Sequence, residues 1–295
     1  MLNLKIIGCL LFLFAGELTA QNRDRLVSPE WLEKRMKEDN LVIFHIGRAP
    51  DYQEAHIPGA TFISAQEYTI DDDVRVFDLP EKAALQSLFE KKGLTNDHTV
   101  VIYTAENWIP LVTRLYFTLD YLGHGEKVFI LDGGMKEWQS KGGPLTSEVP
   151  EITPGNFQIT PDENLLADRT YVLSALENDA IDIVDCRSAV YYTGIEPTRG
   201  ARNGRMPGAK TIPYTSLYEA SDYGAYKFID TDRMRKIFLA QGLSPDCELV
   251  LYCHIGMQLT VVYTTAQILG YQNIKIYDGS FHEWGPDESL PVELD

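Results

Sequence analysis

One cysteine lies where the chain can turn a thiol into a nucleophile. A short apolar stretch at residues 249–252 leads directly into Cys253, Gly256 follows, and a second apolar stretch of helix length covers residues 259–269. A thiol between the end of a strand and the start of a helix lies among unpaired backbone N–H groups, whose dipoles stabilise a thiolate and an anion beside it. The pattern predicts covalent chemistry at Cys253, with a buried and inert cysteine as the alternative.

The segment that contains Cys253 belongs to the second half of an internal repeat. Residues 131–138 (LDGGMKEW) match residues 277–284 (YDGSFHEW), 146 positions further on, and residues 56–60 (HIPGA) match residues 205–209 (RMPGA), 149 positions further on. Such self-similarity indicates a tandem duplication. We expect its seam between residues 142 and 164, where Gly, Pro, Ser and Thr cluster without helical periodicity.

Each copy alternates short apolar runs with longer stretches of helical pattern. We expect strands at residues 41–46, 100–104, 127–131, 181–184, 249–252 and 274–277, and helices at residues 80–92 and 231–241, the second with Asp230 as its N-cap. This alternation predicts an α/β fold in which each copy is a parallel sheet with helices on both faces. Ligands of such sheets bind beyond the carboxyl ends of the strands, where Cys253 is expected.

The composition limits the partners of this fold. The 295 residues suggest two domains, and a hydrophobic content of 44% is that of a globular protein with a sizeable core. Asp and Glu number 43 against 26 Lys and Arg, a net charge of -17 that repels nucleic acids and anionic membrane surfaces. The 6 histidines are scattered and no cysteine pair has zinc-ligand spacing, so we expect neither a nucleic-acid partner nor a metal.

The first 20 residues have the pattern of a secretory signal peptide. Lys5 provides a basic start, and an apolar run too short to span a bilayer leads to Ala20. We expect cleavage near Ala20, a periplasmic or secreted protein without an integral membrane span, and domains at residues 21–150 and 151–295. Cleavage leaves Cys186, Cys247 and Cys253, and an odd number of cysteines cannot all pair within one chain.

The whole mature chain resembles the two-domain rhodaneses, the family of thiosulfate and 3-mercaptopyruvate sulfurtransferases. The motifs that carry the resemblance are residues 183–187 (IVDCR), 206–209 (MPGA), 253–258 (CHIGMQ), 278–280 (DGS) and 283–284 (EW). It implies two tandem rhodanese-like domains, of which the first is catalytically inactive and the second carries a cysteine that becomes a persulfide. The first copy agrees, because Thr104 aligns with Cys253 and cannot hold a sulfane sulfur, Ile46 stands where the second copy has Asp185, and Glu106 adds negative charge.

The resemblance also implies a mechanism that needs no cofactor. The Cys253 thiolate attacks the outer sulfur of thiosulfate or 3-mercaptopyruvate, releases sulfite or pyruvate, and passes the sulfur to a thiol or cyanide. This chemistry needs a depressed thiol pKa and anion donors. Arg187, supported by Asp185, is expected to hold the donor's sulfonate or carboxylate, or alternatively to form a structural ion pair with Asp185. The predicted substrate-binding residues are Arg187, His254, Ile255, Gly256, Met257 and Gln258.

The sequence leaves the choice of donor and the kind of function open. His254 and Gln258 match neither the thiosulfate-preferring nor the mercaptopyruvate-preferring pattern, and the oligomeric state is not predicted. A non-enzymatic sulfur carrier or a redox sensor for a specific partner is the alternative function. Cysteine phosphatases of a related fold need an arginine where this chain has Leu259, which argues against phosphatase chemistry.

A second cysteine is expected near the nucleophile. Cys186 follows a neighbouring strand and should lie on the same side of the sheet as Cys253, whereas Cys247 precedes its strand and should lie at the opposite edge. Cys186 is therefore a candidate to resolve an oxidised Cys253, with small-residue packing as the alternative.

Overall fold

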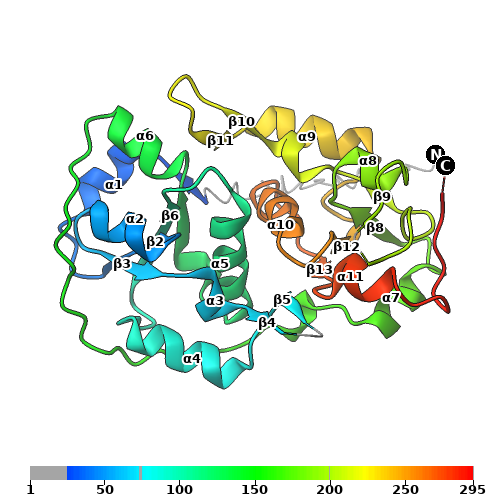
Figure 1. The fold of residues 1–295 in the computed structure, drawn as a ribbon, viewed down its shortest axis with the longest axis horizontal. Helices are drawn as coiled ribbons and strands as arrows, with labels where there is room; N and C mark the ends of the chain where they lie inside the picture. Colours follow the sequence, from blue (N-terminus) through cyan, green and yellow to red (C-terminus); the bar gives the residue numbers. More distant parts are fainter. Residues whose placement is uncertain (1–24, 73–74, 199, 295) are drawn as a thin grey trace, which may run out of the picture.

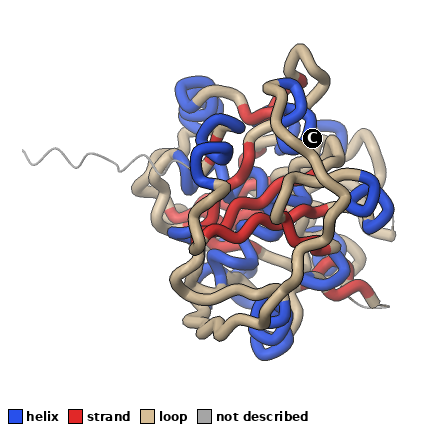
Figure 2. Tube along the Cα trace, turned by 90° about the vertical axis from the view of Figure 1, so that its left-hand side faces the viewer, coloured by secondary structure: helices blue, strands red, loops and turns tan. Residues whose placement is uncertain are grey.

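The computed structural model describes residues 25–72, 75–198 and 200–294, so the predicted signal peptide lies outside the described residues. The two halves of the chain form two α/β units that lie side by side (Figure 1). The strands run through the middle of the molecule with helices around them (Figure 2). The predicted fold class, two tandem units with parallel sheets and helices on both faces, is confirmed. Among the described residues, no helix is long and apolar enough to cross a membrane.

The first unit is built on a five-stranded parallel sheet of order β1-β7-β6-β2-β3. Side chains alternate between its faces, so Phe44 and Ile102 pack under α3, α4 and α5, while Ile43 and Val101 pack under α1 and α6. The strands are β1 (Leu26–Val27), β2 (Leu41–Ile46), β3 (Ala60–Ile63), β6 (Thr99–Thr104) and β7 (Val128–Leu131), and the helices are α1 (Pro29–Arg35), α2 (Ala49–Glu54), α3 (Ala65–Tyr68), α4 (Lys82–Lys91), α5 (Pro110–Tyr121) and α6 (Gly134–Ser140), with a 3₁₀ turn η1 (Gly125–Lys127).

The second unit repeats this plan with the strand order β13-β12-β8-β9, and Leu166 bridges β13 in parallel at the place that β1 takes in the first unit. Helices α7 and α11 cover one face of its sheet, and α9 and α10 cover the other. The strands are β8 (Ile181–Asp185), β9 (Lys210–Thr211), β12 (Glu248–Tyr252) and β13 (Ile274–Ile276), and the helices are α7 (Arg169–Ala175), α8 (Ala189–Tyr192), α9 (Thr231–Ala240), α10 (Leu259–Ile268) and α11 (Ser280–Trp284), with 3₁₀ turns η2 (Glu163–Leu165) and η3 (Tyr214–Leu217).

The predicted elements are present with nearly the predicted boundaries. Each of the expected strands ends within one residue of its expected bounds, and α9 begins at Thr231 as predicted. The Asp230 carboxylate accepts a hydrogen bond of 2.9 Å from the Arg233 amide, which confirms it as the N-cap. Residues 141–162, all of them described, connect α6 to η2 without forming a helix or a strand. Thr146 in this segment forms a single β-bridge with His56.

Helices α5 and α10 join the two units. Every residue of α10 is buried, and every residue of α5 except Asp120 is buried, because the two helices pack against each other and against their own sheets. The Phe117 and Tyr263 rings meet edge to face at 5.1 Å, and the Thr113 and Thr260 hydroxyls share a hydrogen bond of 2.8 Å. A single apolar core therefore runs from one unit into the other.

Two short hairpins cross between the units in opposite directions (Figure 1). The hairpin of β4 (Ile70–Asp71) and β5 (Val76–Asp78) precedes Leu79, whose amide donates to Asp278 Oδ2 at 2.8 Å. The hairpin of β10 (Tyr218–Ala220) and β11 (Tyr226–Phe228) ends at Phe228, whose amide donates to Asp132 Oδ1 at 3.0 Å. Asp132 and Asp278 are the repeat-related aspartates, so each unit holds the other's hairpin through the same residue type.

Candidate active site

The predicted nucleophile lies at the carboxyl end of β12, where the chain leaves the second sheet. Residues 253–258 form a tight loop before α10 begins at Leu259. Gly256 in this loop has a φ of +78°. A Cβ at this position would lie 2.4 Å from Asp278 Oδ1 and 3.3 Å from Arg114 Nη1, so both the backbone conformation and the space require glycine.

Hydrogen-bond donors surround the Cys253 sulfur. The backbone amides of Leu259, Ile255 and Gln258 and the Ser280 hydroxyl all stabilise its thiolate. The Ser280 hydroxyl lies 3.9 Å from Cys253 Sγ and 2.9 Å from the Tyr277 carbonyl, to which it also donates, and its oxygen accepts a hydrogen bond of 3.1 Å from the Cys253 amide. The loop thus supplies local donors for a thiolate and for an anion beside it.

Burial acts against the thiolate. The Cys253 side chain is completely buried. This burial raises the pKa of Cys253 above its usual range, although the surrounding amides and the Ser280 hydroxyl lower it. The depressed thiol pKa expected from the sequence is therefore absent from this closed structure, because the loss of water disfavours the charge more than the donors favour it.

Ser280 is a residue that the sequence analysis missed. It begins α11 with a φ of +53°, in the left-handed region where a residue with a Cβ is uncommon. The corresponding residue of the first unit, 146 positions earlier, is Gly134 with a φ of +55°. The second unit therefore keeps a strained serine where the first has glycine, and its hydroxyl contacts the Cys253 thiol. The difference between DGG and DGS in the repeat is the signal that identifies it.

The side chains of the loop have different surroundings. The His254 ring packs edge-on against Tyr191 at 4.5 Å, and burial, followed by the charge of Arg187, lowers the pKa of His254 to about 4, so this ring is neutral at pH 7. Met257 is fully buried in the core. The Gln258 Oε1 atom is buried without a hydrogen-bond partner among the described residues. The predicted contacts of these side chains with substrate stay predictions.

Arg187 forms the structural ion pair that was the alternative to a substrate contact. Its guanidinium and the Asp185 carboxylate are fully buried, with Nη2 and Oδ2 2.6 Å apart. Nη2 also donates to the Gly204 carbonyl at 2.7 Å, Nε donates to Asp185, and Nη1 donates to Thr198 Oγ1 at 3.1 Å. The Phe281 ring lies 4.1 Å away. Every guanidinium nitrogen is thus bonded within the protein in this structure, and the prediction that Arg187 binds the donor's anionic group stays a prediction.

The alignment of the two copies at this strand end also requires a correction. Tyr103 and Tyr252 are equivalent residues of the two copies. The Tyr103 hydroxyl accepts a hydrogen bond from the Ile57 amide, and the Tyr252 hydroxyl accepts one from the Met206 amide, each directly before the Pro-Gly-Ala turn of its copy. Tyr252 is in register with Asp185, and Tyr103 is in register with His45. His45, rather than Ile46, therefore stands where the second copy has Asp185, and its Nδ1 lies 2.9 Å from the Tyr103 hydroxyl.

An arginine of the first unit reaches the Cys253 loop. Arg114 from α5 is fully buried and forms two bonds to the Asp278 carboxylate, of 2.5 and 3.0 Å. It also donates to the Gly256 carbonyl at 3.1 Å and to the Phe77 carbonyl at 2.7 Å. One side chain thereby ties α5, β5 and the Cys253 loop together. Sequence reasoning missed Arg114 because its partner lies 164 positions away.

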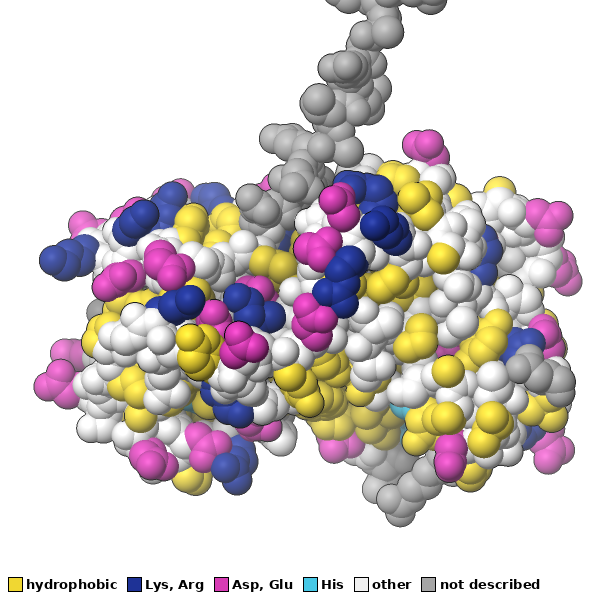
Figure 3. All heavy atoms as spheres, turned by 90° about the horizontal axis from the view of Figure 1, so that it is seen from above, with side chains coloured by type: hydrophobic (Ala, Val, Ile, Leu, Met, Phe, Trp, Pro, Cys, Tyr) yellow, Lys and Arg dark blue, Asp and Glu magenta, His cyan; other side chains and the backbone are white. Residues whose placement is uncertain are grey.

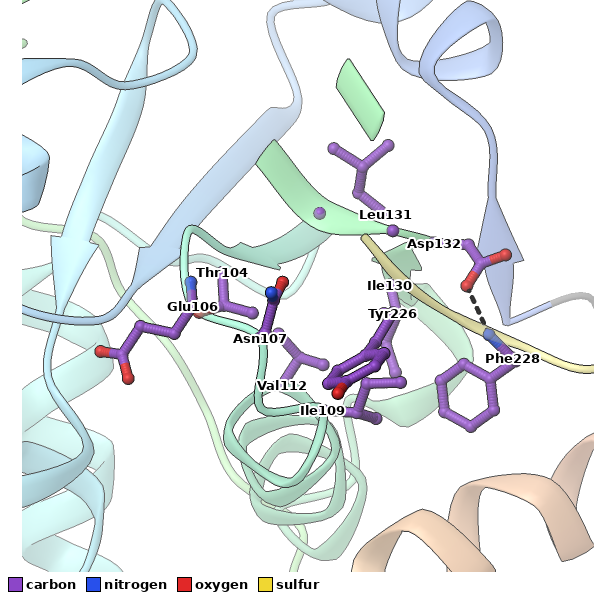
Figure 4. A pocket seen from close by; sticks show the side chains of 12 residues that line it. Thr104, Glu106, Asn107, Ile109, Val112, Ile130, Leu131, Asp132, Tyr226 and Phe228 are labelled. Carbon is purple, nitrogen blue, oxygen red and sulfur yellow. Dashed lines mark hydrogen bonds between the residues drawn. The ribbon is translucent and has the colours of Figure 1, made fainter. Parts of the chain in front are cut away.

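The first unit has a small cavity at the place that corresponds to the Cys253 loop (Figure 4). Thr104 lines it, and Tyr226 and Phe228 of the second unit close it. Its volume is about 20 Å³, room for about one water molecule. Glu106 and Trp108 line a neighbouring hollow of about 410 Å³. The first unit therefore has a loop of the same kind without a thiol, and side chains of the second unit cover it.

Charge at the surface is interleaved rather than separated on the face shown in Figure 3, where Lys and Arg side chains lie among Asp and Glu side chains. An anionic donor must therefore be held by local donors such as those of the Cys253 loop. Within the described residues, no group of His, Cys, Asp and Glu side chains is arranged to hold a metal ion.

Comparisons with known proteins cover nearly the whole chain. The Rhodanese-like domain matches twice, at residues 28–141 and 168–287. The sulfur carrier protein TtuD of Thermus thermophilus is 32% identical over 281 residues, which are 90% of this chain and 95% of that protein. A thiosulfate sulfurtransferase of Azotobacter vinelandii is 29% identical over 271 residues, 91% of this chain and 97% of that protein.

A solved structure agrees with these relatives. The crystal structure of SseA from Escherichia coli, reported as a 3-mercaptopyruvate sulfotransferase with the rhodanese fold, superposes with a TM-score of 0.77 at 26% identity, over 87% of this chain and 98% of that one. Both the duplicated sheets and the two domain matches place the chain in the rhodanese family.

Proposed function

We propose that this protein is a sulfurtransferase that moves a sulfane sulfur from thiosulfate or 3-mercaptopyruvate, through a persulfide on Cys253, to a thiol or cyanide. The observation that carries the proposal is the thiol at the end of β12, surrounded by backbone amides and the Ser280 hydroxyl. The relatives named thiosulfate sulfurtransferase support the reaction class.

The loop's donors suit both half-reactions. In the first, the Cys253 thiolate attacks the outer sulfur of the donor, and sulfite or the pyruvate enolate leaves with the electron pair of the broken bond. In the second, an acceptor thiolate or cyanide attacks the outer sulfur of the persulfide, and the Cys253 thiolate leaves. Negative charge returns to the Cys253 sulfur in this step, where the amides of Leu259 and Ile255 and the Ser280 hydroxyl receive it.

Steady-state sulfur transfer to cyanide tests the proposal, with thiosulfate and 3-mercaptopyruvate assayed in parallel. We expect turnover with at least one donor, and the preferred donor identifies the substrate. Cys253→Ser should abolish turnover, since serine cannot hold the sulfane sulfur. Cys247→Ser is the matched control, because Cys247 is also a free thiol but precedes β12. Turnover by Cys253→Ser at the rate of the parent would disprove the proposal.

A sulfur carrier is the second candidate function. The relative that is 32% identical is named a sulfur carrier protein, and the complete burial of Cys253 agrees with a sulfur that is protected until a partner docks. A carrier should take up one sulfur per chain, visible by mass spectrometry on the peptide of Cys253, and release it slowly to small acceptors. Multiple turnovers with cyanide would instead establish the enzyme.

We also propose that residues 1–20 direct export and are removed, so that the protein acts in the periplasm or outside the cell. Expression of the full chain in a Gram-negative host tests this, with the N-terminus determined by mass spectrometry. We expect Gln21 as the first residue in the periplasmic or secreted fraction. An uncleaved chain confined to the cytosol would contradict export.

A further inference from the structure

A second thiol lies beside Cys253 in the sheet. Strands β8 and β12 are parallel neighbours, in register up to Asp185 and Tyr252. The last pair of this ladder is closed by the Cys186 amide, which donates to the Tyr252 carbonyl at 2.8 Å. Each cysteine is the residue directly after its member of this pair, so the two cysteines lie at the adjacent ends of neighbouring strands.

Both cysteines also face the same side of the sheet. Val184 and Leu251, two positions before the cysteines on their strands, share one apolar cluster with both of them. Tyr252, the residue between, belongs to the cluster on the opposite face. Neighbouring strands lie about 4.8 Å apart, within the Cα separation of about 4.4–6.8 Å that a disulfide spans. This strand spacing is compatible with a disulfide between the two cysteines.

The pair is inaccessible from solution in this structure. Cys186 and Cys253 are both completely buried. Burial, and next the charge of Cys253, raises the pKa of Cys186 well above its usual range, as expected for two thiols close together in the core. The Cys253 side chain thus presents no surface to an acceptor from solution in this structure, whereas Cys186 lies in the same apolar cluster.

We propose that Cys186 is an internal acceptor that releases the sulfur on Cys253 as hydrogen sulfide. The inference rests on the proposed persulfide. The Cys186 sulfur attacks Cys253 Sγ, the bond to the outer sulfur breaks, and the outer sulfur leaves with the electron pair. The outer sulfur takes the Cys186 proton in addition to its own and becomes H₂S. The sulfane sulfur gains two electrons and the two thiols lose two, so the product is a Cys186–Cys253 disulfide. A dithiol reductant returns the pair to its starting state.

The test is a single loading with sulfur in the absence of any other thiol. The purified full chain is reduced, freed of reductant, treated with thiosulfate and desalted. Sulfide release is then followed with time, and the peptides of Cys186 and Cys253 are mapped by mass spectrometry. Parent and Cys247→Ser should release about one sulfide per loaded chain and form the disulfide, because each retains both thiols. Cys186→Ser should keep its persulfide and release sulfide at least about tenfold more slowly.

The outcomes separate this inference from the proposed function. If thiosulfate and 3-mercaptopyruvate both leave Cys253 unloaded, the proposed transfer fails, but inorganic polysulfide forms persulfides without catalysis and still decides the inference. A parent persulfide that persists without sulfide or disulfide would overturn it, as would equal sulfide release by Cys186→Ser. Since Cys186 is buried, Cys186→Ala serves as a second, apolar variant if the serine variant does not fold.

Discussion

Ser280 combines a donor for the thiol with a strained backbone, and substitution can separate the two. Ser280→Ala removes the hydroxyl but keeps a Cβ at a φ of +53°, whereas Ser280→Gly also relieves the strain, as Gly134 does in the first unit. Because the hydroxyl lowers the pKa of Cys253, both variants should raise this pKa. The pH profile of Cys253 alkylation measures the shift.

Both variants lose the hydrogen bond that the Ser280 oxygen accepts from the Cys253 amide, but only glycine relieves the strain, so Ser280→Gly should be more stable than Ser280→Ala by about 1 kcal/mol in the free energy of unfolding. Urea unfolding of the three proteins at one pH measures this difference. If the alkylation profile of Ser280→Ala coincides with that of the parent, the hydroxyl has no effect on the thiol and its assigned role is wrong.

Single residues were predictable where a local pattern determines their place. Cys253 lies at a strand-to-helix turn, and that pattern is contained in consecutive residues. The direction of the Arg187 side chain depends instead on Thr198 and the Gly204 carbonyl, from a loop whose course the sequence does not reveal. Arg114 could not be identified for the same reason, because its partners come from the other unit.

The loop between β12 and α10 is an element held partly from outside its own unit. Arg114→Met would leave the Asp278 carboxylate without its buried partner and the Gly256 carbonyl without a donor. We expect a loss on the order of 3 kcal/mol in the free energy of unfolding and slower formation of the Cys253 persulfide, since the loop amides lose their fixed positions. Urea unfolding and single-turnover loading, followed by mass spectrometry, measure the two effects.

Arg114→Lys is the control for this prediction, since it keeps the charge but not the fork of donors, and it should lose less stability than Arg114→Met. Loading is compared at a temperature at which all three proteins are folded. Equal loading rates in parent and Arg114→Met would show that the loop keeps its shape without this arginine.

Elements were predictable in proportion to their length. Longer elements have clear signals in the sequence, such as the continuous apolar run of β2 and the apolar face of α9. The hairpin strands have only two or three residues each, too few for a periodic pattern, and so the contacts that cross between the units were not foreseen.

At the scale of the whole molecule, the two units share one core and should not separate without loss. All of α10 is buried, partly against α5, so a fragment of residues 151–295 would expose an apolar helix face to water. We expect this fragment to aggregate or to unfold at a lower temperature than the second unit does in the full chain. Light scattering and thermal unfolding of the fragment check this. A soluble fragment that melts at the temperature of the full chain would contradict the shared core.

The contact of Asp132 with the second unit should make stability depend on pH. Its carboxylate accepts a hydrogen bond from the Phe228 backbone N–H (Figure 4). It also lies near the Lys227 ammonium group, which contacts Glu137 as well. Burial nevertheless raises the pKa of Asp132 from 3.8 to about 6. A carboxyl group whose pKa is raised on folding binds its proton more tightly in the folded state. The cost of burying its charge is therefore fully present above pH 6 and disappears as the pH falls toward 4.

Asp132→Asn removes this charge but keeps a side-chain oxygen that can accept the hydrogen bond from the Phe228 backbone N–H. The variant should be more stable than the parent at pH 8, by on the order of 2 kcal/mol in the free energy of unfolding, and should have no such advantage at pH 4. Urea unfolding at both pH values measures the difference. Asp232→Asn is the matched control, because the Asp232 side chain is 84% exposed and its substitution should change the stability little at either pH. An advantage of Asp132→Asn that is the same at pH 4 and pH 8 would show that its charge is not what limits the contact between the units.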